Sequence, residues 1–197
     1  YHRMLGRPND LDTSTPGPID GLENVTMAAV TYLNSCAVHD GGAVSCWGYN
    51  AGGQVGNGDT ERQQLPTLVA GITEAVGVSI GSHSCAWTRV GEVYCWGLNS
   101  HGQTGNEDGV DSLYPRLVVG LPPVRQVVAG DRSTCALTRE NTVYCWGIAG
   151  FDSVVPKRER RHATLVEGLA GIRHLSQWTD TTYGPRGGFC AVRADQT

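Results

Sequence analysis

The sequence predicts an all-β repeat protein in which each unit of about fifty residues forms one small sheet. Two patterns share this period. In the first, Cys-Ala is followed ten residues later by Cys-Trp-Gly; in the second, two glycines lie fifteen residues apart. The cysteine copies are Cys36–Gly48, Cys85–Gly97 and Cys135–Gly147, and the glycine pairs are Gly6 and Gly21, Gly56 and Gly71, Gly105 and Gly120. Because no segment reads as a long amphipathic helix, we expect sheets that are stacked or arranged radially.

Each unit should contain three or four short strands. In the unit that starts at Gly120, Val124–Gly130 is rich in β-branched residues and Ser133–Leu137 follows it. The turn at residues 139–141 then leads into Val143–Gly147 and a long loop. We expect a partial blade at residues 1–20, repeats at about 21–70, 71–119 and 120–167, and a partial repeat at 168–197.

The paired cysteines predict a covalent link across a hairpin. Gly and Asp in His39–Gly42 favour a tight turn that brings Cys36 opposite Cys46, at a distance that suits a disulfide. The predicted disulfides are Cys36–Cys46, Cys85–Cys95 and Cys135–Cys145, and Cys190 is left without a partner. Three such bonds indicate an oxidising compartment. The alternatives are zinc, whose ligands are usually spaced more closely, and reduced buried thiols.

Both ends of the sequence fall inside a repeat. The last copy begins at Phe189–Ala191 and stops before its Cys-Trp-Gly, whereas Tyr1 aligns with Ala51, just after that motif. We favour a piece of a longer array over a four-unit chain whose missing strand comes from elsewhere.

The composition limits the classes of function. With 40% hydrophobic residues the chain can bury a core, and its net charge of −4 argues against a surface built throughout for nucleic acid. No stretch has the roughly eighteen apolar residues that a membrane helix needs, and Tyr1–Arg3 does not begin a signal peptide. We therefore expect no membrane span and no nucleic-acid partner.

The repeated motifs resemble the regulator of chromosome condensation repeat. The motifs that carry this resemblance are Cys46–Asn50, Gly53–Gly56 and Pro66–Gly71 in one unit, and Cys95–Asn99, Gly102–Gly105 and Pro115–Gly120 in the next. The resemblance implies a β-propeller, typically of seven blades with four strands each, so the four repeats seen here would form part of a longer ring. The version with paired cysteines is similar to a bacterial exported branch of the family and, more distantly, to ectodomains of some plant receptor kinases.

Two segments that depart from the repeat pattern, and that we expect to be irregular, mark a candidate partner surface. About seven residues are inserted around Gln177–Tyr183, and Phe151–Arg158 replaces the usual Gly-Gln-x-Gly loop. Exposed aromatic and arginine side chains favour interfaces, and the basic run Lys157–His162 should lie in a loop. The candidate partner-binding residues are Phe151, Lys157, Arg158, Arg160, Arg161, Trp178 and Tyr183. The simpler interpretation is a solvated loop.

The recurring tryptophans are expected to be structural. Trp47, Trp96 and Trp146 occupy one position per unit, which favours packing between blades, and the Gly-Gln-x-Gly glycines should form turns because no Lys-Ser/Thr follows them. No catalytic set, metal triad or cofactor motif can be assembled from the spacing.

The resemblance implies protein binding as the default activity. The founding member of the family exchanges nucleotide on a small nuclear GTPase, a role that disulfides and an acidic chain disfavour, and another relative is a secreted β-lactamase inhibitor. We expect a non-catalytic propeller without cofactor that binds another protein and is extracellular, periplasmic or on the cell surface. It could act as a subunit of an extracellular assembly or an oligomer. The alternatives are an enzyme regulator, meaning an inhibitor or a nucleotide-exchange-like propeller, and a purely structural scaffold.

Overall fold

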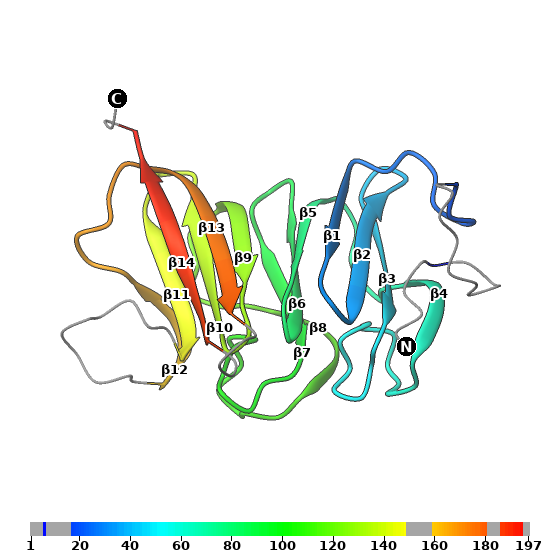
Figure 1. The fold of residues 1–197 in the computed structure, drawn as a ribbon. Helices are drawn as coiled ribbons and strands as arrows, with labels where there is room; N and C mark the ends of the chain where they lie inside the picture. Colours follow the sequence, from blue (N-terminus) through cyan, green and yellow to red (C-terminus); the bar gives the residue numbers. More distant parts are fainter. Residues whose placement is uncertain (1–5, 7–16, 149–158, 181–185, 195–197) are drawn as a thin grey trace.

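The structure of the chain is a computed structural model that describes Gly6 and residues 17–148, 159–180 and 186–194. These residues form fourteen strands and no helix (Figure 1). The strands make three four-stranded antiparallel sheets and one two-stranded sheet, each with its strands in sequence order. The all-β prediction is therefore confirmed.

Each sheet is one blade. Blade 1 contains β1 (Met27–Val30), β2 (Asn34–His39), β3 (Ala43–Gly48) and β4 (Gln63–Leu68). Blade 2 contains β5 (Ala75–Ile80), β6 (His83–Thr88), β7 (Val93–Gly97) and β8 (Ser112–Leu117). Blade 3 contains β9 (Val124–Ala129), β10 (Ser133–Thr138), β11 (Val143–Ile148) and β12 (Glu159–Leu165). The two described strands of blade 4 are β13 (Ile172–Asp180) and β14 (Arg186–Arg193).

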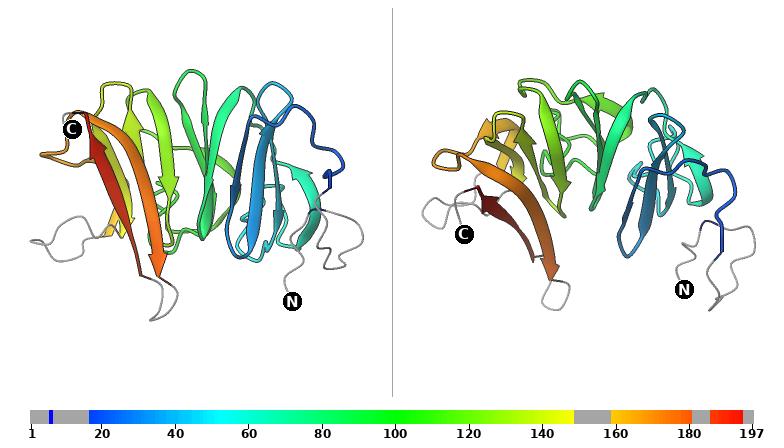
Figure 2. Two further views of the ribbon diagram at one scale, coloured as in Figure 1. Left: turned by 45° about the horizontal axis from the view of Figure 1, so that its top comes forward. Right: turned by 90° about the horizontal axis from the view of Figure 1, so that it is seen from above.

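The blades stand side by side along an arc (Figure 2). The first strands β1, β5, β9 and β13 contact one another in turn and lie toward the inside of the arc, whereas β4, β8 and β12 are outermost. This arrangement is that of a β-propeller. Because the strands alternate in direction, the connections fall on two faces. We call the face with the β2–β3, β6–β7 and β10–β11 turns the upper face, and the face with the β1–β2, β3–β4 and β13–β14 connections the lower face.

The hydrophobic core is divided into three layers, one between each pair of neighbouring blades. The first layer joins Val38 and Val44 of blade 1 to Val78 and Trp96 of blade 2. The second and third layers join blades 2 and 3, and blades 3 and 4, in the same way. Each blade is thus stabilised mainly by its neighbours, as is typical of repeat proteins.

The structure contains the three predicted disulfides. Cys36 pairs with Cys46 across β2 and β3 with a Cα–Cα distance of 4.1 Å, and the equivalent pairs in blades 2 and 3 have the same register. The turn above them needs left-handed backbone, with φ of 42° at Asp40, 79° at Gly41 and 122° at Gly42. Cys190 is exposed and has no disulfide partner within the described residues.

The structure corrects the expectation that the insertion in blade 4 is irregular around Trp178. The β13–β14 pairing continues through it, with Gln177 opposite Phe189, Trp178 opposite Gly188 and Asp180 opposite Arg186. The extra residues lengthen a hairpin at its lower end. Backbone pairing does not require the repeat pattern, so a segment that departs from the pattern can still extend two strands.

The basic run Lys157–His162 was expected to lie in a loop, and this prediction is wrong for the C-terminal half of the run. Arg160, Arg161 and His162 belong to β12, where Arg160 pairs with Gly147 of β11 across a register shift. An outermost strand is solvated on one edge, so charged side chains are tolerated there. Lys157 and Arg158 lie outside the described residues.

One buried histidine links blades 2 and 3. His83, at the start of β6, is fully buried, and its Nε2 lies 2.6 Å from Oγ1 of Thr134 in β10. Its Nδ1 is buried and has no hydrogen-bond partner. Burial lowers the pKa of His83 from 6.5 to about 3, because a charged imidazolium would lose its hydration.

The stability of the chain should therefore fall on acidification. The folded state keeps His83 neutral, whereas the unfolded state binds a proton below about pH 6.5, so unfolding becomes easier as the pH falls from 6.5 toward 3. We expect this residue to remove about 2 kcal/mol of unfolding free energy between pH 8 and pH 5. Denaturant titrations followed by tryptophan fluorescence at each pH would measure it.

The control is His83→Asn, which introduces the residue found at the equivalent position of blade 1, Asn34. The difference between the chain and this variant isolates the histidine from carboxylates that also titrate. Parallel pH profiles for the two proteins would contradict the assignment.

Candidate functional site

The lower face is built on loops that are closed by repeated asparagines. Asn50 follows β3, and its Oδ1 accepts the N–H of Val55 at 2.8 Å while its Nδ2 donates to Asp59 and to the carbonyl of Glu61. Asn99 of blade 2 accepts the N–H of Thr104 at 3.1 Å in the same way. Both asparagines are buried, so each loop is held from inside and presents a fixed surface.

Each of these loops also receives hydrogen bonds from the next blade. The main-chain carbonyl of Gln54 accepts Nε1 of Trp96 and Oγ of Ser84, each at 2.9 Å. In the following blade the carbonyl of Gln103 accepts Oγ1 of Thr134 at 2.7 Å. The Gly-Gln-x-Gly segment is therefore a joint between blades as well as a turn.

The second glycine of this segment makes room for the tryptophan of the next blade. A Cβ built on Gly56 would lie 2.6 Å from Nε1 of Trp96, and one built on Gly105 would lie 3.2 Å from Nε1 of Trp146. These two indoles and that of Trp47 are buried. The predicted packing role of the three tryptophans is confirmed, because each ring fills space that a side chain on the preceding loop would block.

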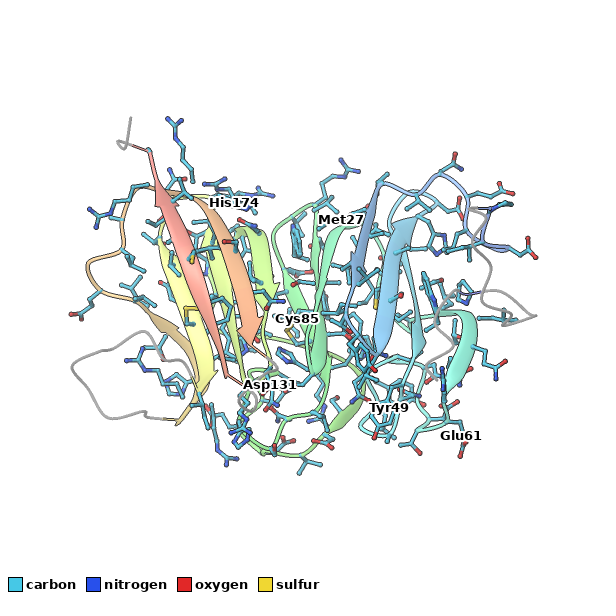
Figure 3. The ribbon with its side chains drawn as sticks, viewed as in Figure 1. Met27, Tyr49, Glu61, Cys85, Asp131 and His174 are labelled. Carbon is cyan, nitrogen blue, oxygen red and sulfur yellow. A yellow bond between two sulfur atoms is a disulfide. The ribbon has the colours of Figure 1, made fainter. Side chains whose placement is uncertain are left out.

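Three exposed apolar residues of blade 1 form a patch on the lower face. Val30 at the end of β1 and Tyr32 in the β1–β2 connection are 76% and 78% exposed, and Tyr49 after β3 is 44% exposed. The N–H of Tyr49 donates to the carbonyl of Leu33 at 3.0 Å, so the two segments are in contact. Figure 3 shows Tyr49 on the lower face. We call Val30, Tyr32 and Tyr49 the tyrosine patch. Amphipathic tyrosine rings exposed on a rigid support are enriched in protein interfaces.

Two ion pairs lie on the lower face. Arg116 contacts Asp108 at 2.7 Å, and Arg132 contacts Asp131 at 3.3 Å. The N–H of Val110 and then the Arg116 guanidinium lower the pKa of Asp108, so this carboxylate is ionised at neutral pH. Among the described residues of this face, the tyrosine patch is therefore the feature that best suits contact with another protein.

The structure describes only some of the residues predicted to bind a partner. Arg161 rests on the lower-face loop of blade 2, where its Nη1 donates to the carbonyl of Glu107 at 3.3 Å and its Cα would be 2.8 Å from a Cβ on Gly102. Arg160 is half-buried. Phe151, Lys157, Arg158 and Tyr183 lie outside the described residues, and for Trp178 the structure describes the backbone alone. The strand ends that flank these segments are on the lower face.

The sequence did not point to the tyrosine patch. Tyr32 and Tyr49 occupy repeat positions, whereas the candidate partner residues were those in segments that depart from the repeat pattern. A register comparison could have found Tyr32, because its equivalent in blade 3 is Asp131, a residue that is normally solvated.

Two further features of the described residues bear on function. In this part of the chain no three His, Cys, Asp or Glu side chains are close enough together to hold a metal ion. The same residues include no helix with the length and apolar character needed to cross a membrane.

Comparison with known protein families gives a consistent result. Residues 41–87 and 90–137 match the model described as "Regulator of chromosome condensation (RCC1) repeat", and residues 124–151 match a second model with the same description. Together these matches cover more than half of the chain. The E3 ubiquitin-protein ligase HERC2 of Homo sapiens and that of Mus musculus are each 40% identical over 70 residues. This alignment covers 34% of the chain and 1% of the length of HERC2.

Solved structures share the fold. Human WBSCR16 superposes with a TM-score of 0.69 and 23% identity, over 79% of this chain and 44% of that one. Prp20p of Saccharomyces cerevisiae, whose binding to Gsp1p and histones has been characterised, superposes with a TM-score of 0.71 and 21% identity, over 83% of this chain and 43% of that one. The chain thus spans less than half of each.

The glycine–tryptophan contact makes a matched pair of substitutions informative. Gly56→Ala places a Cβ against Trp96 in left-handed backbone with φ 81°, whereas Gly71→Ala has a similar φ of 75° and open space around it. Both should lose about 1 kcal/mol through backbone strain, and Gly56→Ala should lose a further 1–3 kcal/mol or so through overpacking. Chemical denaturation would measure both, and equal losses would show that the indole does not need this glycine.

Proposed function

Because the chain belongs to the regulator of chromosome condensation (RCC1) repeat family, we propose that it is a non-catalytic β-propeller that binds another protein through its lower face. The observation that carries the proposal is the tyrosine patch, in which Tyr32 is 78% exposed on a blade that is closed by a disulfide. A protein partner would cover the two rings and form hydrogen bonds with their hydroxyl groups.

The rigidity of the support favours binding. Asn34 donates from Nδ2 to the carbonyl of Tyr49, and the Cys36–Cys46 bond joins β2, which begins after Tyr32, to β3, which ends before Tyr49. A preorganised surface loses little conformational entropy when a partner docks, so a small number of aromatic anchors is sufficient. No catalytic step is proposed for this face.

We further propose that the protein works in an oxidising environment, either extracellular, periplasmic or at the cell surface. The support for this is chemical, since three disulfides at one repeated position persist where thiols are not kept reduced. A nucleotide-exchange role is not proposed, because the likeness to Prp20p concerns the fold at 21% identity.

Substitution of the most exposed tyrosine tests the binding face. Tyr32→Ala should weaken the partner complex at least about tenfold, because truncated aromatic anchors dominate interface energies. The partner would be identified by affinity isolation from the extracellular or periplasmic fraction, and its dissociation constant measured by biolayer interferometry with purified proteins. Tyr114→Ala is the control, since Tyr114 is 56% exposed but lies on the outermost strand β8. Equal affinities of the Tyr32→Ala protein and the unaltered chain would rule out this face.

Peptide mapping without reduction tests the redox assignment. When the protein is isolated from its native source with thiols alkylated at lysis, we expect three cross-linked cysteine pairs and an alkylated Cys190. Alkylation of all seven cysteines would contradict an oxidising compartment, and it would do so without affecting the binding-face proposal.

A further inference from the structure

The upper face divides into an acidic region over blade 1 and an arginine-rich region over blades 2 to 4. Exposed carboxylates over blade 1 and its junction with blade 2 are Glu23, Asp40 and Glu74. Exposed arginines over the other blades are Arg89, Arg125, Arg139, Arg173 and Arg193, with His174 beside them and three glutamates, Glu92, Glu140 and Glu167, among them. Figure 3 shows His174 at the upper end of β13, on the side opposite Asp131 and Tyr49.

Arg125 and Arg193 lie next to Ile172, the first residue of β13, and exposed Arg173 follows it in sequence. Nη2 of Arg125 in β9 donates to the carbonyl of Ile172 at 2.9 Å and to Oδ1 of Asn141 at 2.8 Å. Arg193 of β14 lies directly opposite Ile172 in the β13–β14 ladder, and Arg173 follows Ile172 in sequence. We call Arg125, Arg173 and Arg193 the arginine cluster.

Uncharged oxygens, and no carboxylates among the described residues, accept the hydrogen bonds of Arg125 and Arg193. Besides the bonds of Arg125, Nη2 of Arg193 donates to the carbonyl of Gly168 at 2.8 Å, and the Arg139 guanidinium donates to the carbonyl of Arg89. Among the described residues no ion pair involves any of the five upper-face arginines. The guanidinium groups are thus partly ordered while their charges remain uncompensated, which is the state that favours an incoming carboxylate.

A groove lies on the same face where blade 2 leads into blade 3. Its volume is about 310 Å³, and it is lined by the apolar residues Val90, Leu117, Val119, Leu121 and Pro123 and by one carboxylate residue, Glu92. Val90 is 58% exposed and Val119 is 69% exposed. The β10–β11 turn lies between the groove and the cluster: the N–H of Arg139 donates to the carbonyl of Pro123, its guanidinium donates to the carbonyl of the residue before Val90, and Asn141 of the same turn accepts from Arg125.

We propose that the arginine cluster and this groove together bind an acidic segment of a partner protein that carries one apolar side chain. Carboxylates of the segment pair with Arg173 and Arg193, and the apolar side chain fills the groove beside Val119. Glu23, Asp40 and Glu74 repel the acidic segment from blade 1 and so set its direction. This site is distinct from the tyrosine patch, which lies on the opposite face.

The same features disfavour a nucleic acid as the occupant. A backbone of regularly spaced phosphates needs an extended basic track, whereas the basic region here ends against an acidic one and the chain has a net charge of −4. A phosphate also gains nothing from a groove lined by valine, leucine and proline.

Fluorescence anisotropy with a labelled peptide tests the proposal. The probe has a central leucine between two blocks of three glutamates, and a second probe replaces the leucine with serine. Arg173→Gln with Arg193→Gln should weaken binding of the leucine probe at least about tenfold, because two charge-assisted contacts are lost. The control pair, Arg62→Gln with Arg132→Gln, removes the same charge from the opposite side and should change binding less than about twofold.

A third variant tests the groove. Val119→Ser should weaken the leucine probe and leave the serine probe unchanged, since only the leucine uses the apolar lining. Because Arg193 also donates to the carbonyl of Gly168, Arg173→Glu serves as a variant that removes no hydrogen bond or ion pair formed among the described residues, and it should abolish binding on its own.

Three outcomes would overturn the proposal. The first is an equal loss for the two glutamine pairs, which would mean that only net charge matters. The second is tighter binding of a single-stranded oligonucleotide of the same charge than of the leucine probe. The third is a dimer in sedimentation that Arg173→Glu dissociates, which would mean that a second copy of the chain covers the upper face and places its acidic region against the arginines. Unchanged probe binding by Tyr32→Ala would separate this site from the lower face.

Discussion

The structure depends on one steric arrangement repeated from blade to blade, in which a glycine without a side chain admits the indole of the next tryptophan. The close approach of Gly56 to Trp96, and of Gly105 to Trp146, fixes the position of each loop relative to the sheet that follows it. The carbonyl of Gln54 then lies where Trp96 and Ser84 can both donate to it. Since the hydrophobic core is divided into layers between blades, this contact sets the geometry of each layer.

The two faces of the arc follow from that geometry but serve different chemistry. On the lower face, the buried asparagines accept hydrogen bonds from main-chain N–H groups within their loops, while Tyr32 and Tyr49 remain exposed. On the upper face, side chains reach the main chain of the neighbouring blade, as Arg125 donates to the carbonyl of Ile172. A propeller can in this way present one face with exposed aromatic rings and another with arginines that are not ion-paired, without changing its repeat.

The repeat made most of the fold predictable from the sequence. Cys36 and Cys46 could be paired because a ten-residue spacing around Asp and Gly determines a hairpin register, and the role of Trp96 followed from its recurrence. Trp178 and Arg160 were placed wrongly because strand pairing is a property of the backbone, which persists where the sequence pattern stops. The arginine cluster could not be foreseen, since Arg125 and Arg193 are brought together only by the stacking of two blades.

The position of the disulfides has a mechanical consequence. Each one joins the second and third strands of its blade, so β4, β8 and β12 are attached to their sheets by hydrogen bonds and side-chain packing alone. The innermost strands β1, β5 and β9 are attached in the same way, so if the molecule were pulled along its chain, each stapled hairpin would resist extension while the strands on either side of it could separate. The covalent bonds thus protect the central hairpins of blades 1 to 3 against stretching and leave the innermost and outermost strands as the compliant parts.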